Sequence, residues 1–216
     1  MTHLKRHKAP KRWPIARKGT TFIVRPNFSP TRGVPLLVVL RDMLKIAQNR
    51  KEVKKAIHEK LILINQKETK DDKNALTLFD TLTLIPSKKS YRLSLGENGK
   101  YSLEEISEKE AGEKITKVMD KKILKGKKVQ LNLRDGKNYL SDIKCNTEDS
   151  VVVNFDKKKI EKCLPMKEGA KVIIVEGKHA GKKGVIRKLK LERKMASVKV
   201  GEDNINVLIK QIMAVE

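Results

Sequence analysis

Charge is the feature of this sequence that most constrains what it can fold into. Its 216 residues include 50 lysines and arginines against 26 acidic residues, which gives a net charge of +24 at pH 7. A compact body with that excess repels itself and is therefore expected to sit beside a polyanion. Because only 38% of the residues are hydrophobic and 4% are aromatic, we expect several small cores. Nucleic acid is the favoured polyanion, since neutralising its phosphates releases condensed counterions.

Membrane surfaces also attract cations, but the sequence gives no sign of a membrane partner. No stretch approaches the ~18 consecutive apolar residues of a spanning helix. Residues 1–18 are basic and lack the apolar core of a signal peptide. We therefore expect a cytoplasmic protein.

The two cysteines, Cys145 and Cys163, do not form a CxxC pair, and no histidine lies at ligand spacing from either. A structural zinc site normally needs four cysteine or histidine ligands. We therefore predict two buried thiols in a reducing compartment, with no metal and no cofactor.

Residues 1–32 are predicted to form a basic N-terminal extension. Prolines at positions 10, 14, 26 and 30 prevent a long helix. The segment has little apolar surface, so it could be disordered alone and fold on RNA, and the sequence leaves open whether it is ordered without RNA. A solvated tail without a partner is the alternative. Trp13 argues against that alternative, because an indole among cations either anchors on the protein or stacks on a base. The predicted RNA contacts in this extension are Lys5, Arg6, Lys8, Lys11, Arg12, Trp13, Arg17, Lys18 and Arg32.

Residues 33–87 are predicted to begin with two helices. Pro35 suits a first helical position, and the apolar residues at positions 36, 37, 40, 44 and 47 follow helical spacing. Asn49 and Glu52 have the pattern of an N-cap with a returning carboxylate. In the second helix, a cationic face lies opposite an apolar one; such faces are usually only solvated, but this one has almost no acidic partner. The predicted RNA contacts here are Arg41, Lys45, Arg50, Lys51, Lys54 and Lys55, with His58 on the same face.

Short strands are expected at residues 61–64, 76–79 and 82–85, with a turn at 71–74. The order of two helices followed by strands resembles the small RNA-binding module shared by the bacterial ribosomal protein S-four, pseudouridine synthases and tyrosyl-tRNA synthetases. The resemblance implies that the helix pair presents its cations to structured RNA.

Residues 88–165 are predicted to form a central, mostly-β domain. Strands are expected at 127–133, 139–143 and 150–154. Ser107 and Glu110 have the pattern of a capping box, and Ala111, Ile115 and Val118 are expected to line one face of the helix that follows. Acidic residues between positions 104 and 113 suit the start of a helix, and they suggest a structural part that faces away from RNA.

Residues 166–216 are predicted to be all β, and their first hairpin is the sharpest local signal in the chain. A strand is expected to end at Glu176, and Gly177 then permits a tight turn. Gly181 and Gly184 allow close approach of another backbone. A phosphate-cradling P-loop is excluded because the GxxxxGK[ST] spacing is absent, while an ordinary glycine-rich hairpin stays the alternative. The predicted RNA contacts are Gly177, Lys178, His179, Gly181, Lys182 and Lys183.

This hairpin resembles the KOW motif of ribosomal proteins and NusG-type transcription factors. The order of the four segments resembles the archaeal and eukaryotic small-subunit ribosomal S-four-e family. The likeness is carried by residues 3–6, 9–10, 13–15, 34–36, 40–47, 130–133, 135–138 and 178–181. The chain departs from the family pattern at residues 28–33, which lack its histidine, at 65–67, which replace an Asp-Gly turn, and at Phe79, where methionine is common.

The resemblance implies a multi-module α+β fold that ends in an SH3-like KOW β-barrel. It also implies a structural constituent of the small ribosomal subunit that binds rRNA and supports assembly and translation. The implied partners are small-subunit rRNA and neighbouring ribosomal proteins, without a small-molecule substrate. A KOW-containing transcription factor or a general nucleic-acid-binding protein is the alternative. We exclude an RNA-modifying enzyme, because Asp120, Asp135, Asp142, Asp149 and Asp156 have the pattern of turn or surface residues.

Overall fold

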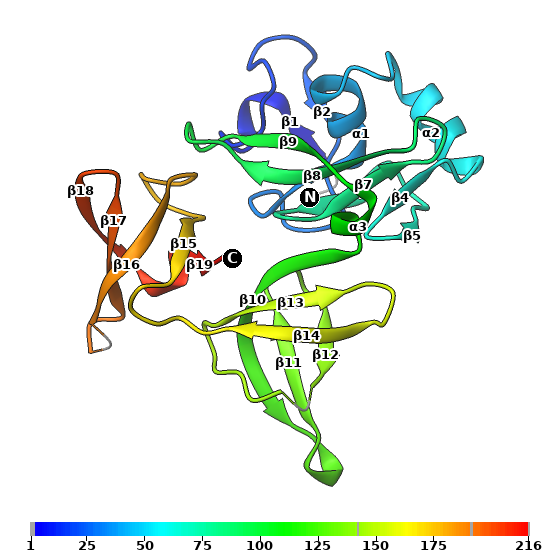
Figure 1. Cartoon of the computed structure of the whole chain (residues 1–216). Coiled ribbons are helices and arrows are strands. Elements are labelled where there is room, and N and C mark those ends of the chain that lie inside the picture. Colours follow the sequence, from blue (N-terminus) through cyan, green and yellow to red (C-terminus); the bar gives the residue numbers. More distant parts are fainter. Residues whose placement is uncertain (1–2, 142, 191, 216) are drawn as a thin grey trace. The chain divides into compact units, whose positions relative to one another are not determined.

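The computed structural model describes residues 3–141, 143–190 and 192–215. Over these residues the chain is mostly β-strand with few helices (Figure 1). It divides into two compact units. The first unit runs to Leu95 and resumes from Lys100 to Gly112, and the second holds Gly96–Gly99 and the described residues from Glu113 onward.

The N-terminal segment is folded onto the first unit. Strand β1 (Leu4–Lys5) pairs antiparallel with β2 (Phe22–Ile23), and the short 3-10 helix η1 (Arg6–Lys8) follows β1. Trp13 is only 2% exposed, and its Nε1 donates to the carbonyl oxygens of Pro30 at 3.2 Å and Gly33 at 3.0 Å. The indole therefore anchors the segment. This corrects the prediction of Trp13 as a direct RNA contact, because a buried ring has no face to offer a base.

The first predicted helix is shorter and less regular than its apolar spacing suggested. Pro35 ends strand β3 (Gly33–Pro35), which pairs with β6 (Ala75–Thr77), and it precedes the helix instead of beginning it. Helix α1 (Leu36–Val38) runs into a π-helical turn, η2 (Val39–Met43). A π turn inserts an extra residue and changes which side chains face the core, so a constant helical step does not describe it.

The second predicted helix is confirmed as α2 (Arg50–His58). Asn49 Oδ1 accepts from the Glu52 amide at 3.1 Å, and the Glu52 carboxylate accepts from the Gln48 amide and Asn49 Nδ2, each at 2.7 Å. The bond from Glu52 satisfies one of the amides that the first turn of a helix leaves without partners. Val53 and Ile57 are buried, as the apolar face of the helix requires.

The main sheet of the first unit is antiparallel, with the order β5-β4-β7-β8-β9. Asn65 and Gln66 both have positive φ, at 52° and 58°, in the two-residue turn between its first strands. Asn65 is buried and donates to Asp80 Oδ1 at 2.7 Å, which ties this turn to the start of the neighbouring strand. The strands are β4 (Ile62–Ile64), β5 (Lys67–Glu68), β7 (Thr81–Leu84), β8 (Lys89–Leu95) and β9 (Tyr101–Ile106).

The N-cap at Ser107 is confirmed, but the long helix predicted after it is wrong. Ser107 Oγ accepts from the Glu110 amide at 3.4 Å, and helix α3 (Glu108–Ala111) ends there. The chain then enters the strand β10 (Glu113–Ile123). That strand pairs on both sides, with β11 (Val129–Leu133) and β13 (Ser150–Asn154), and its β-branched residues suit this environment.

The central sheet of the second unit has the order β12-β11-β10-β13-β14. Its outer strands are β12 (Asn138–Leu140) and β14 (Lys159–Leu164). The core of this sheet includes Val118, Leu131 and Val153. Lys114 and Asp135 form a buried ion pair, with Nζ and Oδ2 2.9 Å apart. The predicted strand at residues 150–154 is confirmed with the same bounds.

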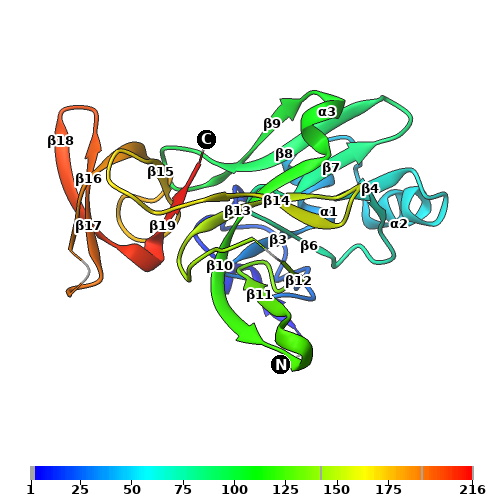
Figure 2. The ribbon, with the colours of Figure 1, turned by 60° about the horizontal axis from the view of Figure 1, so that its bottom comes forward.

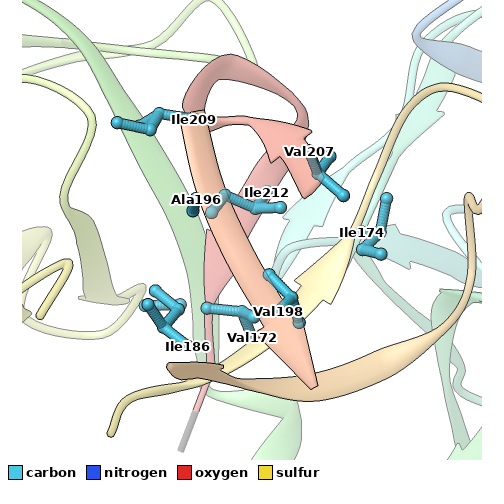
Figure 3. Close-up of a cluster of buried hydrophobic side chains, with 9 residues drawn as sticks. Val172, Ile174, Ile186, Ala196, Val198, Val207, Ile209 and Ile212 are labelled. Carbon is cyan, nitrogen blue, oxygen red and sulfur yellow. The ribbon is translucent and has the colours of Figure 1, made fainter. Parts of the chain in front are cut away.

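The C-terminal sheet of the second unit is also antiparallel, with the order β18-β17-β16-β15-β19. Figure 3 shows the aliphatic core that its strands enclose, which includes Val172, Ile186 and Val198. A Cβ added at Gly184 would lie 2.3 Å from the Lys199 carbonyl oxygen, which confirms the predicted close approach. The elements are β15 (Lys171–Ile174), β16 (Lys183–Lys190), β17 (Met195–Val200), β18 (Asp203–Leu208), the 3-10 helix η4 (Ile209–Gln211) and β19 (Ile212–Ala214).

A buried lysine connects the two sheets of the second unit. Lys117, on β10, is fully buried. Its Nζ donates to the carbonyl oxygens of Ile209 at 2.5 Å and Ile212 at 2.8 Å, and it pairs with Glu148 Oε2 at 2.6 Å. Burial lowers the pKa of Lys117, and the bond to Glu148 offsets part of that effect. Two carbonyl oxygens and one carboxylate therefore surround this ammonium group.

Candidate RNA-binding surface

The predicted cationic face of α2 exists and is exposed. We call it the α2 face, and it consists of Lys51, Lys54, Lys55 and His58, all of which are exposed. Lys55 Nζ lies 3.8 Å from Glu59, one turn along the helix. This distance between two solvated groups leaves the positive potential of the face largely intact.

The α2 face continues onto the turn that precedes β6. Lys54, His58 and Lys70 border a pocket of about 380 Å³, whose lining also includes Arg50 and Lys73. The two aspartates in this lining, Asp71 and Asp72, already have hydrogen-bond partners. The cations of the helix and of the turn therefore form one continuous surface within the first unit.

Two of the predicted contacts in this region also have structural partners. Arg50 donates to the buried Asp72 carboxylate from Nε at 2.6 Å and from a terminal nitrogen at 3.1 Å. This hydrogen bond raises the pKa of Arg50, against the opposing effect of burial. Arg41 pairs with its neighbour Asp42 at 2.9 Å, whereas Lys45 is exposed. The sequence pattern did not predict either arginine pairing.

Within the N-terminal segment, two of the predicted RNA contacts hold the backbone. The Arg6 guanidinium donates to the carbonyl oxygens of Ala16 and Thr20, each at 3.0 Å, and to Thr20 Oγ1 at 2.8 Å. Arg17 donates to the His7 carbonyl oxygen at 3.0 Å. The remaining predicted cations of the segment are partly or fully exposed: Lys5, Lys8, Lys11, Arg12, Lys18 and Arg32.

The loop between β15 and β16 is held by its own hydrogen bonds. The Gly181 amide donates to Ile174 O at 2.7 Å, and the Ile174 amide donates to Lys182 O at 3.0 Å. Gly177 adopts a φ of 94°, which confirms the predicted turn. The strand ends at Ile174, two positions before the predicted Glu176. Lys178 and Lys183 are exposed at the loop, while His179 and Lys182 are half-buried.

A further cationic element was missed from the sequence. The hairpin between β10 and β11 carries lysines at positions 121, 122, 125, 127 and 128 and no acidic residue between them. We call residues 121–128 the β10–β11 finger. The 3-10 turn η3 (Lys125–Lys127) forms its tip, with Gly126 at a φ of 77°. Figures 1 and 2 show the finger extending beyond the other strands of its sheet.

An apolar side chain stands among the lysines of the β10–β11 finger. Ile123 is 72% exposed, whereas residues such as Leu131 on the same hairpin are fully buried. Some nucleic-acid-binding proteins insert an exposed apolar side chain between bases, while cations around it contact the nucleic acid. The lysine run was available as a signal, but the acidic residues at 104–113 led to the interpretation of this region as purely structural. The acidic residues at positions 104–110, however, belong to the first unit, whereas the β10–β11 finger belongs to the second.

The groups considered for metal binding or catalysis have structural surroundings. Within the described ranges, no cluster of three or more histidine, cysteine, aspartate or glutamate side chains could hold a metal ion. Cys145 is buried, but Cys163 is only half-buried, which corrects the prediction of two buried thiols. Burial and the neighbouring Cys145 raise the pKa of Cys163 to about 12. Asp149 accepts from the amides of Asn146 and Met166, each at 2.9 Å.

Of the other aspartates, Asp135 is used in the ion pair with Lys114, Asp120 and Asp156 are exposed, and Asp142 lies outside the described residues. In the part of the chain that the structure describes, no helix has the length and apolar character needed to cross a bilayer.

Comparison with known families gives two matches along the chain. Residues 2–30 match the RS4NT (NUC023) domain, and residues 87–160 match Ribosomal family S4e. The two matches cover the N-terminal segment and much of the central region.

Curated relatives match over most of the chain. A protein named small ribosomal subunit protein eS4 from Methanocella arvoryzae is 38% identical over 197 residues, which covers 90% of this chain and 83% of the relative. A protein of the same name from Halobacterium salinarum is 37% identical over 207 residues, covering 94% and 89%. The crystal structure of the 30S ribosomal protein S4e from Thermoplasma acidophilum aligns with a TM-score of 0.72 at 25% identity, covering 85% of this chain and 95% of that one.

Proposed function

The chain belongs to the ribosomal S4e family, and on that premise we propose that it is a structural constituent of the small ribosomal subunit. It binds small-subunit rRNA beside neighbouring ribosomal proteins and supports assembly and translation. A family of ribosomal structural proteins is not a family of enzymes, so the protein has no catalytic role. The alternatives, a KOW-containing transcription factor or a general nucleic-acid-binding protein, find no support among these relatives. Its place is the small subunit of the cytoplasmic ribosome.

The α2 face carries the RNA-binding part of this proposal. Its side chains are exposed and lie on one side of a helix whose other side is packed. A row of lysines on a rigid helix suits the phosphates of an A-form duplex, whose recognition depends on shape and backbone contacts. Lys70 and Lys73 extend the positive surface.

We also propose the finer organisation that the sequence suggested. It has four parts: a basic extension at 1–32, an RNA-binding module at 33–87, a central domain at 88–165 and a KOW SH3-like barrel at 166–216. Strands β8 and β9 of the central segment pair with β7 and complete the sheet of the module. The barrel is supported by the five-stranded antiparallel order of the C-terminal sheet and by the self-bonded loop between β15 and β16. In this arrangement Gly177, Lys178, His179, Gly181, Lys182 and Lys183 present the loop to RNA.

Sedimentation of a tagged protein from a lysate tests the ribosomal assignment. The protein should migrate with the small subunit at moderate salt and stay there after a high-salt wash. Migration with RNA polymerase, or release as free protein, would reject an integral ribosomal protein.

The salt dependence of RNA binding tests the α2 face. Replacing Lys51, Lys54 and Lys55 with glutamine should reduce the slope of log affinity against log salt by roughly 2–3 units, because each lost phosphate contact removes nearly one. A control variant with Lys88, Lys89 and Lys109 replaced loses the same charge from exposed positions of the first unit. Equal slopes for the two variants would remove the α2 face from the interface.

The β10–β11 finger requires a separate test. Replacing the exposed Lys122, Lys125 and Lys128 with glutamine should weaken incorporation into small subunits. The control replaces Lys157, Lys158 and Lys159, which are exposed on the other hairpin of the same sheet. If both variants are incorporated like the unaltered protein, the finger does not contact RNA.

A further inference from the structure

A second and larger pocket lies beside the α2 face, and it combines aromatic and cationic walls. Its volume is about 740 Å³, within the ~300–1,000 Å³ of pockets that bind small ligands. One wall is strand β2 with the segment that follows it, and the other comes from Arg50 and the turn at Lys73. All of its lining residues belong to the first unit.

The aromatic wall consists of His3 and Phe22. Their ring centroids lie 5.6 Å apart, with an angle of 51° between the planes. Phe22 is 53% exposed, while Ile23, the next residue on the strand, is 8% exposed and faces the core. An exposed aromatic ring inside a basic pocket is a stacking surface of the kind on which proteins hold unpaired bases.

The charge of the pocket is positive. Arg25, Arg50 and Lys73 line it, and no carboxylate is among the described residues of its lining. The nearest acids have other partners, since Asp72 is bound by Arg50 and Asp71 accepts from Asn27 Nδ2 at 3.2 Å. Burial works to raise the pKa of Asp71, but hydrogen bonds from the Lys73 amide and Asn27 hold it below its usual value. Asp71 therefore stays ionised and keeps its structural bonds at neutral pH.

The two walls are joined by hydrogen bonds. The Asn27 amide donates to the Lys73 carbonyl oxygen at 3.0 Å, and its side chain reaches Asp71 from the same segment. Arg50 ties the start of α2 to Asp72 in that turn. A pocket whose walls are already fixed loses little conformational freedom when it is filled, which favours binding.

Two residues connect this pocket to the α2 face. Arg50 and Lys73 line both this pocket and the smaller pocket bordered by Lys54, His58 and Lys70. A nucleotide in the large pocket would therefore have its neighbouring phosphates beside the lysines of the helix. A free nucleotide would leave those lysines unused.

We propose that this pocket binds one unpaired nucleotide of an RNA strand, with the base against Phe22 and His3 and the backbone phosphates beside Arg25 and Lys73. The inference rests on the proposed function, because the strand is a segment of the rRNA that the α2 face binds. It adds a site for a single base to a surface that otherwise contacts only phosphates.

The test uses the full-length protein and a five-nucleotide RNA with 2-aminopurine at its centre. Stacking in the pocket should quench the fluorescence of this base analogue. Phe22→Leu should lower the affinity about tenfold, the typical effect of losing one aromatic stacking partner, and should abolish quenching. Ile85→Ala is the matched control, because Ile85 is a similarly exposed apolar residue of the first unit. Since Phe22 is exposed, its replacement should leave the melting temperature unchanged.

A second variant keeps the test independent of the aromatic ring. The double variant Arg25→Gln/Lys73→Gln should bind the RNA with lower affinity and with a weaker salt dependence. Each RNA molecule that still binds should be quenched to the same extent as with the unaltered protein. If AMP binds as tightly as the five-nucleotide RNA, the occupant is a free nucleotide and the proposal of a strand is overturned. If the Phe22 variant binds RNA normally but enters subunits poorly, a protein partner occupies the pocket, and the proposal is overturned as well.

Failure of the pocket and failure of the proposed function give different results. If only the pocket proposal fails, the protein still binds full-length rRNA, and this binding still depends on the α2 face. Absence of any rRNA binding by the unaltered protein would instead reject the function from which the inference starts.

Discussion

Lys117 offers a sharp test of how the second unit is held together. Its ammonium group is fully buried between the central and C-terminal sheets and is bound to two backbone carbonyl oxygens and to Glu148. Replacement by methionine keeps a side chain of similar length and removes the charge and all three donors. The two carbonyl oxygens then lose these bonds, and the partly exposed Glu148 carboxylate loses its counter-charge.

The expected cost follows from these contacts. Leaving a buried acceptor without its partner costs about 1–3 kcal/mol, and removing one partner of a buried ion pair costs about 3–5 kcal/mol. Relief from burying an ammonium group opposes this loss, while the entropy of ordering the side chain changes little, because methionine is about as flexible as lysine. Glu148 also has access to water. We therefore expect Lys117→Met to lower the free energy of unfolding by about 3 kcal/mol, near the lower end of the ion-pair range.

Urea unfolding of the full-length protein, followed by circular dichroism, measures this change. The control is Lys122→Met, which removes an exposed lysine from the same strand and should change stability by less than about 0.5 kcal/mol. The double variant with Glu148→Gln should recover part of the loss, because it also removes the carboxylate left without a counter-charge. A Lys117→Met protein as stable as the unaltered one would refute the reasoning, since it would mean that burying the ammonium group cancels everything its bonds contribute.

The same lysine gives a prediction with a definite sign in pH. Because the pKa of Lys117 is lowered in the folded state, the unfolded chain binds more protons than the folded one between that lowered pKa and the unfolded value near 10.5. The free energy of unfolding contributed by this group therefore rises with pH in that window. The stability difference between the unaltered protein and Lys117→Met should grow as the pH approaches 10.5, and a constant difference would contradict a lowered pKa.

Three further substitutions test other parts of the fold. Gly184→Ala would place a Cβ 2.3 Å from the Lys199 carbonyl oxygen, and we expect a loss of about 1–3 kcal/mol, measured as a lower melting temperature. Gln66→Gly should raise the free energy of unfolding by about 0.5–1 kcal/mol, because Gln66 has a φ of 58° that glycine adopts without strain; an unchanged value would show that the turn is not strained. Trp13→Phe leaves the carbonyl oxygens of Pro30 and Gly33 without the indole donor, so it should cost about 1–3 kcal/mol and speed protease cleavage within residues 3–32. Cleavage at the original rate would mean that this anchor does not hold the segment.

Local signals in the sequence predicted local structure well. The caps at Asn49 and Ser107 are formed by the expected side chains, because capping depends on residues only three positions apart. The strand at 150–154 has the predicted bounds. A short run of β-branched residues with a turn on each side is sufficient to locate a buried strand of this kind.

Features that depend on distant partners were not predicted. The helix expected after Ser107 became a strand because β11 and β13 offer it a ladder on each side, and no local propensity reveals those partners. Lysine is almost never fully buried without a partner, so Lys117 gave no sign of its position. Its two carbonyl acceptors lie 92 and 95 residues away along the chain. The aromatic pocket was missed for a similar reason, since its lining comes from residues 3–4 and 22–27, from Arg50 and from Lys73.

Part of the candidate site was predictable from composition and spacing alone. The α2 face follows from helical periodicity, and the loop after β15 follows from its glycines and lysines. Arg6, Arg41 and Arg50 matched the same pattern of cations, yet each also has a partner within the protein. A cation count does not separate arginines that hold the fold from lysines that are free to meet phosphates.

The folded N-terminal segment has a thermodynamic consequence for assembly. A segment that orders only on binding removes apolar surface from water at that moment, which gives association a large negative change in heat capacity. In this protein Trp13 is already buried and β1 is already paired with β2. The heat capacity change on binding RNA should therefore come only from the interface itself, and the association rate should depend strongly on ionic strength but weakly on temperature.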